Sequence, residues 1–162
     1  MLRRDQLHDY QVRACEFAKT TPRCALLLEM GLGKTVSTLT AIVDLIYCLD
    51  ISRVLVIAPK MVAATTWVDE ASAWEHTQHL SVACATGDAK RRLRAINAGA
   101  DITTIGRDNI QWLAAQYPNG LPYDMVVLDE LSSYKDSSTK RFKVLRKLLV
   151  GVPRIVGLTG TP

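Results

Sequence analysis

Short apolar runs of four or five residues alternate along this chain with longer segments whose apolar side chains recur at helical spacing. Continuous runs of β-branched residues and leucine are typical of strands that are buried on both faces. Six such runs predict strands at Ala25–Leu28, Val54–Ala58, Ser81–Ala85, Ile102–Ile105, Met125–Leu128 and Ile155–Leu158. The segments with helical spacing predict helices at Tyr10–Lys19, Lys34–Leu49, Val62–Trp74, Ala89–Ala98, Asp108–Gln116 and Thr139–Leu149.

The regular alternation of strands and helices predicts the fold class. Parallel strands require crossover connections, which helices usually supply, and such β-α-β units are right-handed. We therefore expect an α/β fold of three layers, in which a mainly parallel sheet is flanked by helices. No repeat, low-complexity tract or linker interrupts the pattern, so residues 1–162 are expected to form a single domain. In such a fold, the loops at the carboxyl ends of the strands carry the chemistry.

Composition and charge change this picture only slightly. A chain of 162 residues can bury a substantial core, and 48% hydrophobic with 22% charged residues is ordinary for a globular protein. The net charge of +4 permits a polyanionic partner without establishing one. The longest apolar helical stretch, from Val36 to Leu49, is too short for a bilayer and contains Asp44, and the N-terminus lacks the apolar core of a signal peptide. We therefore expect a cytoplasmic protein without membrane contact.

The cysteines do not suggest a metal or redox site. Their spacing matches neither a C-x-x-C motif nor a zinc site, and each has apolar neighbours. We expect reduced, buried and inert thiols at Cys15, Cys24, Cys48 and Cys84.

The most specific motif is the sequence LEMGLGKT at residues 28–35, which lies between a predicted strand and a predicted helix. Strand, glycine loop and helix in this order are typical of the phosphate-binding loop of nucleotide hydrolases. Glycines allow backbone N–H groups to turn toward phosphate oxygens, and the helix N-terminus adds partial positive charge. Lys34 is expected to reach the terminal phosphates and Thr35 to hold Mg²⁺. The predicted nucleotide-binding residues of the loop are Met30, Gly31, Leu32, Gly33, Lys34 and Thr35.

Two adjacent acids, Asp129 and Glu130, follow the apolar run Met125–Leu128. Alone, acids at the end of a strand are more often solvated side chains. Behind a phosphate-binding loop, however, Asp129 is expected to hold Mg²⁺, directly or through water, and Glu130 to orient and polarise the attacking water. Together with Lys34, they are the predicted catalytic residues.

Three motifs together resemble those of Swi/Snf-type ATPases, a branch of the superfamily-two helicases. They are the loop at residues 29–35, the upstream sequence LHDYQ at residues 7–11, and the sequence LTGTP at residues 158–162. In that branch, the glycine that phosphate loops usually have at the position of Leu28 is typically absent. After the two acids the family commonly has alanine and histidine, whereas this chain has Leu131 and Ser132, a departure that resembles the compact helicase-like ATPases of phages and prophages.

The resemblance implies the first, N-terminal RecA-like lobe of such an enzyme, a P-loop NTPase domain that uses ATP and Mg²⁺. It assigns Gln11 to the adenine edge, and an amide can both donate to and accept from adenine. It also assigns the coupling of hydrolysis to movement to Thr159, Gly160 and Thr161. The implied partners are duplex DNA and a second RecA-like lobe, which this chain lacks.

Candidate nucleic-acid contacts also follow from the resemblance. Lys60 comes directly after the run Val54–Ala58, where the family has a loop near the nucleic-acid backbone. Thr104 and Arg107 occupy the position of another such motif, although a simple end of a strand explains them equally well. Trp67 and Trp74 lie seven residues apart on one predicted helical face, a spacing that indicates core packing rather than base stacking.

The predicted function is the ATP-binding lobe of a DNA translocase or helicase-like enzyme, which couples ATP hydrolysis to movement on duplex DNA. A second lobe would supply arginines to the ATP cleft, and an arginine finger contributes roughly 10³ to 10⁵ in rate. The isolated lobe is therefore expected to be nearly inactive. Three alternatives remain open: another P-loop enzyme such as a small kinase or GTPase, a non-catalytic nucleotide- or DNA-binding module, and a single-strand helicase.

Overall fold

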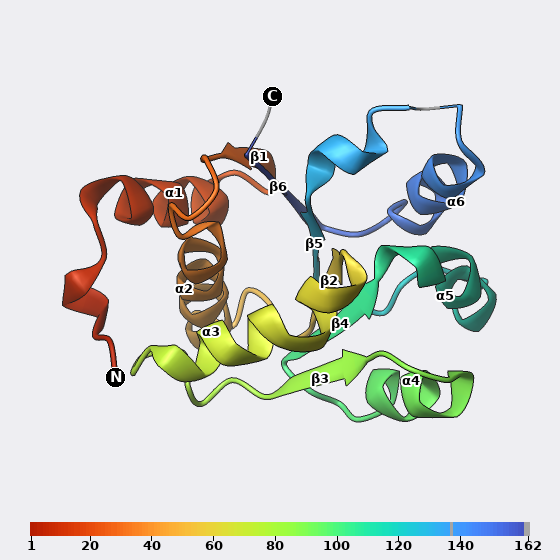
Figure 1. The fold of residues 1–162 in the computed structure, drawn as a ribbon, viewed down its shortest axis with the longest axis horizontal. Helices are drawn as coiled ribbons and strands as arrows, with labels where there is room; N and C mark the ends of the chain where they lie inside the picture. Colours follow the sequence, from red (N-terminus) through yellow and green to blue (C-terminus); the bar gives the residue numbers. More distant parts are fainter. Residues whose placement is uncertain (137, 161–162) are drawn as a thin grey trace.

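A computed structural model describes residues 1–136 and 138–160 of the chain, in which strands and helices alternate (Figure 1). The strands are β1 (Arg23–Leu27), β2 (Val54–Ala58), β3 (Val82–Ala85), β4 (Ile102–Gly106), β5 (Met125–Asp129) and β6 (Arg154–Thr159). The α-helices are α1 (Asp9–Thr20), α2 (Lys34–Tyr47), α3 (Trp67–Ala73), α4 (Ala89–Ile96), α5 (Ile110–Gln116) and α6 (Lys140–Leu148). Each predicted element is present, and most of the ends are shifted by one or two residues.

Shorter helical turns accompany these elements. Three are 3₁₀ turns and η2 is a π-helical turn, which replaces the first part of the single helix that we expected over Val62–Trp74. Their bounds are η1 (Arg4–Gln6), η2 (Val62–Thr66), η3 (Arg107–Asn109) and η4 (Leu131–Tyr134). Among the residues that the structure describes, no helix is both long enough and apolar enough to cross a membrane.

The six strands are all parallel, in the order β1-β6-β5-β2-β4-β3. This confirms the predicted α/β fold with a parallel sheet. Every residue of β2 and β4 is buried, as the continuous apolar runs predict for central strands. β1 differs because it is an edge strand, paired only with β6 in the described part of the chain. Its side chains are mostly exposed, including Leu27 at 60%.

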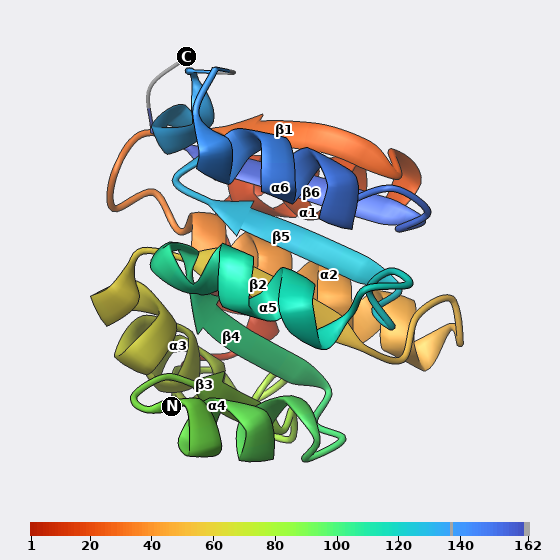
Figure 2. The same ribbon diagram turned by 90° about the vertical axis from the view of Figure 1, so that its right-hand side faces the viewer.

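Helices α1, α2 and α3 cover one face of the sheet, and α4, α5 and α6 cover the other (Figures 1 and 2). Successive residues of a strand point to opposite faces. Accordingly, Val54 and Val56 of β2 pack with α1, α2 and α3, whereas Leu55 and Ile57 pack with the other three helices. The sheet thus separates two apolar cores, and the loops at its ends are free to carry a site.

The expectation of four buried thiols is wrong for Cys48, which is exposed. Helix α2 ends at Tyr47, and the chain turns into solvent there, so that Leu49 is 91% exposed. Cys24 and Cys84 are half-buried. Only Cys15 is buried as expected, and burial raises the pKa of its thiol to about 11, which keeps it protonated and unreactive at neutral pH.

Candidate nucleotide-binding site

The phosphate-binding loop and the two acids meet at the carboxyl edge of the sheet. β6 lies between β1 and β5, so that Leu27 of β1 is paired with Thr159, and Asp129 of β5 is paired with Leu158. Directly after β1, the N–H of Leu28 donates to the carbonyl of Thr159 (3.2 Å). Strand order therefore brings together sequence motifs that lie far apart in the chain.

Two glycines give the loop its shape. Gly31 and Gly33 have φ angles of +80° and +78°, in the left-handed region that favours glycine. Gly33 is also crowded, because a Cβ at this position would overlap Nε2 of Gln11. Gly33 directly precedes α2, whose first N–H groups have no partner within the helix and can bind an anion. The loop thus has the backbone geometry that the predicted phosphate binding requires.

Lys34 turns back over this loop. Its Nζ donates to the carbonyl oxygens of Leu28 (2.7 Å) and Glu29 (3.1 Å). The ammonium group therefore lies inside the curve of the loop, where a terminal phosphate would be its strongest acceptor. Thr35 follows in the first turn of α2 and is half-buried, a position from which its hydroxyl can ligate Mg²⁺.

Gln11 is 7% exposed and connects α1 to the loop, whereas taken alone it would read as a surface glutamine. Its Oε1 accepts from the N–H of His8 (2.9 Å), and its Nε2 donates to the carbonyl of Leu32 (3.2 Å). Each atom of the amide has a second bonding position, so one lone pair and one proton remain for a ligand. These two bonds fix the orientation of the group that the family resemblance assigns to adenine.

Asp129 is more deeply enclosed than the loop. Its Oδ2 accepts a hydrogen bond from Nε1 of Trp67 (3.0 Å), which is fully buried at the start of α3. Burial raises the pKa of the Asp129 carboxyl, while the Trp67 hydrogen bond and the charge of Lys34 act in the opposite direction. Burial is the largest of these influences, so Asp129 is held in a less polar setting than the loop.

The sequence predicted only part of the role of Trp67. Core packing was the correct expectation, but its hydrogen bond to Asp129 was missed. A signal existed, because a buried indole N–H usually requires an acceptor.

Glu130 directly precedes η4 and has an unusual backbone conformation. Its φ of +61° lies in the left-handed region, where a non-glycine residue is uncommon and costs about 1 kcal/mol. Its Oε1 accepts from the hydroxyl of Ser132 (3.0 Å). Ser132 occupies the position where the family commonly has histidine, and here it contacts Glu130 directly. Strain of this kind is concentrated at functional sites, where surrounding contacts hold it in place.

The predicted nucleic-acid contacts separate into two groups. Lys60 is exposed after β2, and its Cα lies 3.6 Å from where a Cβ of Gly106 would stand, so Lys60 is a near neighbour of Arg107 in η3. Thr104 is different, because its side chain is fully buried and its hydroxyl donates to the carbonyl of Ala63 (2.5 Å). Thr104 therefore joins β4 to η2 and is not presented to a nucleic acid, which corrects the prediction.

Two of the residues predicted to couple hydrolysis to movement, Thr159 and Gly160, lie against the loop. Thr159 is buried at the end of β6. A Cβ at Gly160 would lie 3.5 Å from the backbone nitrogen of Met30 and 3.6 Å from the carbonyl oxygen of Leu28. This segment is therefore in contact with the phosphate-binding loop. Thr161 and Pro162 lie outside the described residues.

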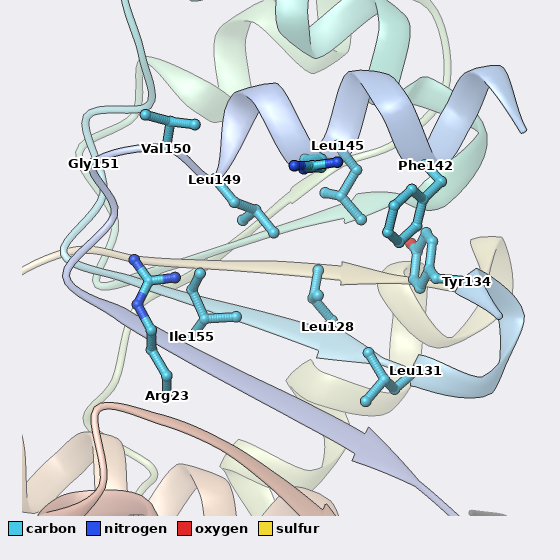
Figure 3. A pocket seen from close by; sticks show the side chains of 11 residues that line it. Arg23, Leu128, Leu131, Tyr134, Phe142, Leu145, Leu149, Val150, Gly151 and Ile155 are labelled. Carbon is cyan, nitrogen blue, oxygen red and sulfur yellow. The ribbon is translucent and has the colours of Figure 1, made fainter. Parts of the chain in front are cut away.

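An apolar hollow of about 440 Å³ lies apart from this site, between α6 and strands β5 and β6 (Figure 3). Leu145 of α6 and Leu149, directly after this helix, point into it from one side, and Leu128 and Ile155 of the strands from the other. Its lining includes Leu131, one residue beyond Glu130, but neither the phosphate-binding loop nor Asp129. The hollow is therefore not part of the candidate nucleotide site.

Comparison with known proteins finds relatives that are similar to this chain in sequence and solved structures that are similar to it in fold. The model of the SNF2-related domain family matches residues 10–162. Protein p41 of Acyrthosiphon pisum secondary endosymbiont phage 1 is 37% identical over 140 residues, which cover 82% of this chain and 30% of that protein. The DNA excision repair protein ERCC-6-like of Mus musculus is 32% identical over 142 residues, covering 83% of this chain and 11% of that protein.

Among solved structures, the Sulfolobus solfataricus SWI2/SNF2 ATPase core in complex with dsDNA superposes with a TM-score of 0.83 at 25% identity. The match covers 97% of this chain and 32% of that chain. This chain therefore spans less than a third of the length of these relatives.

Proposed function

The chain belongs to the SNF2-related family of ATPase domains, and from this premise we propose that it is the ATP-binding lobe of an enzyme that moves along duplex DNA. The juxtaposition of the phosphate-binding loop with Asp129 and Glu130 across β6 supports this function most directly. ATP hydrolysis requires phosphate binding, a metal ligand and a group that orients water, and these residues offer all three.

Each group at the sheet edge has a separate task in this proposal. The N–H groups of the loop and of the first turn of α2 bind the phosphates, and Lys34 contacts the terminal ones. Thr35 and Asp129 hold Mg²⁺, which supplies positive charge to the phosphates when it is bound. Glu130 accepts a hydrogen bond from the attacking water and orients it. Gln11 selects adenine with the one amide proton and the one oxygen lone pair that its backbone hydrogen bonds leave free.

Lys60 and Arg107 are the proposed DNA contacts. They lie side by side after β2 and β4, at the same edge of the sheet as the nucleotide site, and can bind phosphates of the DNA backbone. The Sulfolobus relative is described in complex with dsDNA, which supports duplex DNA as the partner. A nucleotide- and DNA-dependent activity also implies an intracellular location.

Full activity is proposed to require a second RecA-like lobe. The chain matches only about a third of the Sulfolobus ATPase core, so the remainder of such a core is available to complete the ATP cleft. Arginines from that lobe would stabilise the charge that develops on the transferred phosphoryl group, an effect of roughly 10³ to 10⁵ in rate.

Steady-state ATPase assays test this proposal. The chain is measured alone and fused to the remainder of the Sulfolobus core, with and without duplex DNA, and Glu130→Gln serves as the inactive reference. We expect very slow hydrolysis by the chain alone and DNA-stimulated hydrolysis by the fusion. DNA-stimulated turnover of the chain alone at the rate of the fusion would contradict the need for a second lobe. DNA binding without hydrolysis in the fusion would instead support a non-catalytic module.

Competition with GTP tests the role of Gln11. We expect the chain to prefer ATP, and Gln11→Ala to reduce that preference. Equal binding of ATP and GTP by the unaltered chain would favour a different class of P-loop enzyme.

A further inference from the structure

Trp67 makes the contact that most constrains the metal-site acid. Its indole N–H donates to Oδ2 of Asp129 at 3.0 Å, and its side chain is 0% exposed. A bond to one carboxylate oxygen fixes the rotation of the whole group, so it also fixes the direction of the other oxygen. A carboxylate that accepts this bond retains further lone pairs for a cation.

We propose that Trp67 is a positioning residue, which holds the Asp129 carboxylate in the orientation that binds Mg²⁺. This inference rests on the proposed function, because that function assigns Asp129 to the metal. Groups that bond the far side of a metal ligand commonly set its orientation, and their loss typically weakens metal binding 10- to 100-fold.

The backbone around Trp67 is itself anchored, so the indole cannot easily follow a moving carboxylate. Trp67 directly follows the π-helical turn η2. Within this turn, the N–H of Ala63 donates to the carbonyl of Pro59 (2.9 Å), and the carbonyl of Ala63 accepts from the hydroxyl of Thr104 (2.5 Å). The turn is thereby bonded to the residue that follows β2 and to β4. π-Helical turns often occur at functional sites, where they redirect a side chain.

The turn also lies next to the proposed DNA contacts. Lys60 immediately precedes the segment that leads into η2, and Arg107 follows the strand that carries Thr104. The same short segment therefore lies between the proposed DNA contacts and Trp67, whose indole is bonded to the proposed metal ligand.

Trp74 provides a matched control within the chain. It is also buried, at 6% exposure, and its Nε1 donates to a carboxylate oxygen of Glu70 (3.2 Å). Glu70 belongs to α3 and lies outside the proposed site. Trp67→Phe and Trp74→Phe thus remove the same type of hydrogen bond and a similar volume, and only the first bond belongs to a metal ligand.

Calorimetric titration of the 162-residue chain with ATPγS at a series of Mg²⁺ concentrations tests the inference. Trp67→Phe is expected to raise the Mg²⁺ concentration for half-maximal enhancement of binding about tenfold. Trp74→Phe is expected to leave it unchanged, and both variants should bind ATPγS without Mg²⁺ as the unaltered chain does. A purely structural role of Trp67 would instead weaken binding with and without Mg²⁺ alike.

Asp129→Asn sharpens the test, because residues that act through one another are not additive. Once Asp129→Asn has removed the carboxylate, adding Trp67→Phe should cause no further loss of Mg²⁺ dependence. A full additional loss would overturn the inference, as would identical behaviour of the Trp67 and Trp74 variants. Absence of any Mg²⁺ effect on the unaltered chain would overturn the proposed function itself, and the inference with it.

The indole NMR resonances of the unaltered chain provide a second test, which does not require any variant to fold. In ¹⁵N–¹H spectra of the unaltered chain, the Nε1–H signal of Trp67 should shift when Mg²⁺ is added to the ADP-bound chain, and that of Trp74 should not. Equal responses of the two signals would contradict the positioning role.

Discussion

The two halves of the candidate nucleotide site are held in place very differently. In the loop half, Met30 is 88% exposed, and Lys34 is bonded to carbonyl oxygens of the loop itself. In the acid half, Asp129 is bonded to a fully buried tryptophan that is anchored to the neighbouring strands. Asp129 is therefore preorganised, whereas the loop can exchange its internal bonds for bonds to phosphate.

Strand position explains this difference. β5, which carries Asp129, lies between β2 and β6, whereas β1, which leads into the loop, is one of the two edge strands of the described sheet. A strand with partners on both sides moves only with the sheet, but an edge strand and its following loop are less constrained. The fold thus places the element that must adapt at the edge and the element that must stay fixed in the interior.

Removing the ammonium group of Lys34 should have the largest effect. It should weaken phosphate binding by the loop half of the site and leave the acid half undisturbed. Lys34→Ala is expected to weaken ATP binding about 100-fold, because one or two charge-assisted hydrogen bonds to phosphate are lost. Equilibrium titration with ATP measures the change. Lys143→Ala removes an exposed positive charge from α6 and controls for net charge.

The acids should be unaffected by this change. The Trp67 indole resonance of Lys34→Ala should lie close to that of the unaltered chain, because the bond to Asp129 does not depend on the loop. A large shift of this resonance would show that the two halves are not independent, and ATP binding at full strength would exclude Lys34 from phosphate binding.

Two alanine substitutions within the loop separate backbone strain from crowding. Gly31→Ala should lower the free energy of unfolding by about 1 kcal/mol, since it forces a Cβ into the left-handed region. Gly33→Ala should cost about 2 kcal/mol or more, because it adds the same strain and also displaces the buried amide of Gln11. Among the described residues, no heavy atom beyond the two chain neighbours lies within 4 Å of a Cβ at Gly31, which makes it the matched control.

Urea unfolding measures both changes. Equal losses of unfolding free energy for the two variants would mean that Gln11 moves aside without cost. The hydrogen bond from Gln11 of α1 to the loop would then not stabilise the loop.

Local patterns in the sequence predicted most of the fold and the main motifs of the site. The run Val54–Ala58 is apolar at every position, and it forms a strand buried at every position. The alternation of such runs with helical segments was sufficient to predict the parallel sheet, and parallel topology then brought the loop and the acids to one edge. These features depend on neighbours in sequence or on a general rule of chain connection.

Features that depend on partners distant in sequence were not predicted. An apolar run does not reveal whether its strand is central or at an edge, so the exposure of Leu27 was missed. The spacing of Trp67 and Trp74 indicates burial but not which acceptor each indole meets. Thr104 reads as the polar end of a strand until the carbonyl of Ala63, on a different element, satisfies its hydroxyl. Burial of polar groups requires a specific partner, and one-dimensional spacing does not identify it.

The smallest expected effect concerns a group of ion pairs that lies away from the loop but stabilises the helices that support it. Asp44 of α2 binds Arg4 (2.6 Å) and Lys19 of α1 (2.9 Å), and thereby holds together the two helices that support the loop. The Asp44 side chain is only 15% exposed, but Arg4 is 48% exposed, so solvent screens part of the attraction. Asp44→Asn should lower the free energy of unfolding by about 1 kcal/mol at neutral pH. Asp5→Asn, at an ion pair whose partners are both 65% exposed, should cost almost nothing.

The pH dependence of the free energy of unfolding tests whether Asp44 acts through its charge. The hydrogen bond from Arg4 lowers the pKa of Asp44 below its ordinary value in the folded chain. A carboxyl with a depressed pKa stabilises the fold above its unfolded pKa of about 3.9, and this contribution is lost as the pH falls through the folded value. The difference between the unaltered chain and Asp44→Asn should therefore be constant from neutral pH to about pH 5 and shrink below about pH 4. If the difference in free energy of unfolding persisted undiminished to acidic pH, Asp44 would stabilise the two helices by packing rather than by charge. The loop half would then be supported by uncharged contacts, as the acid half is by Trp67.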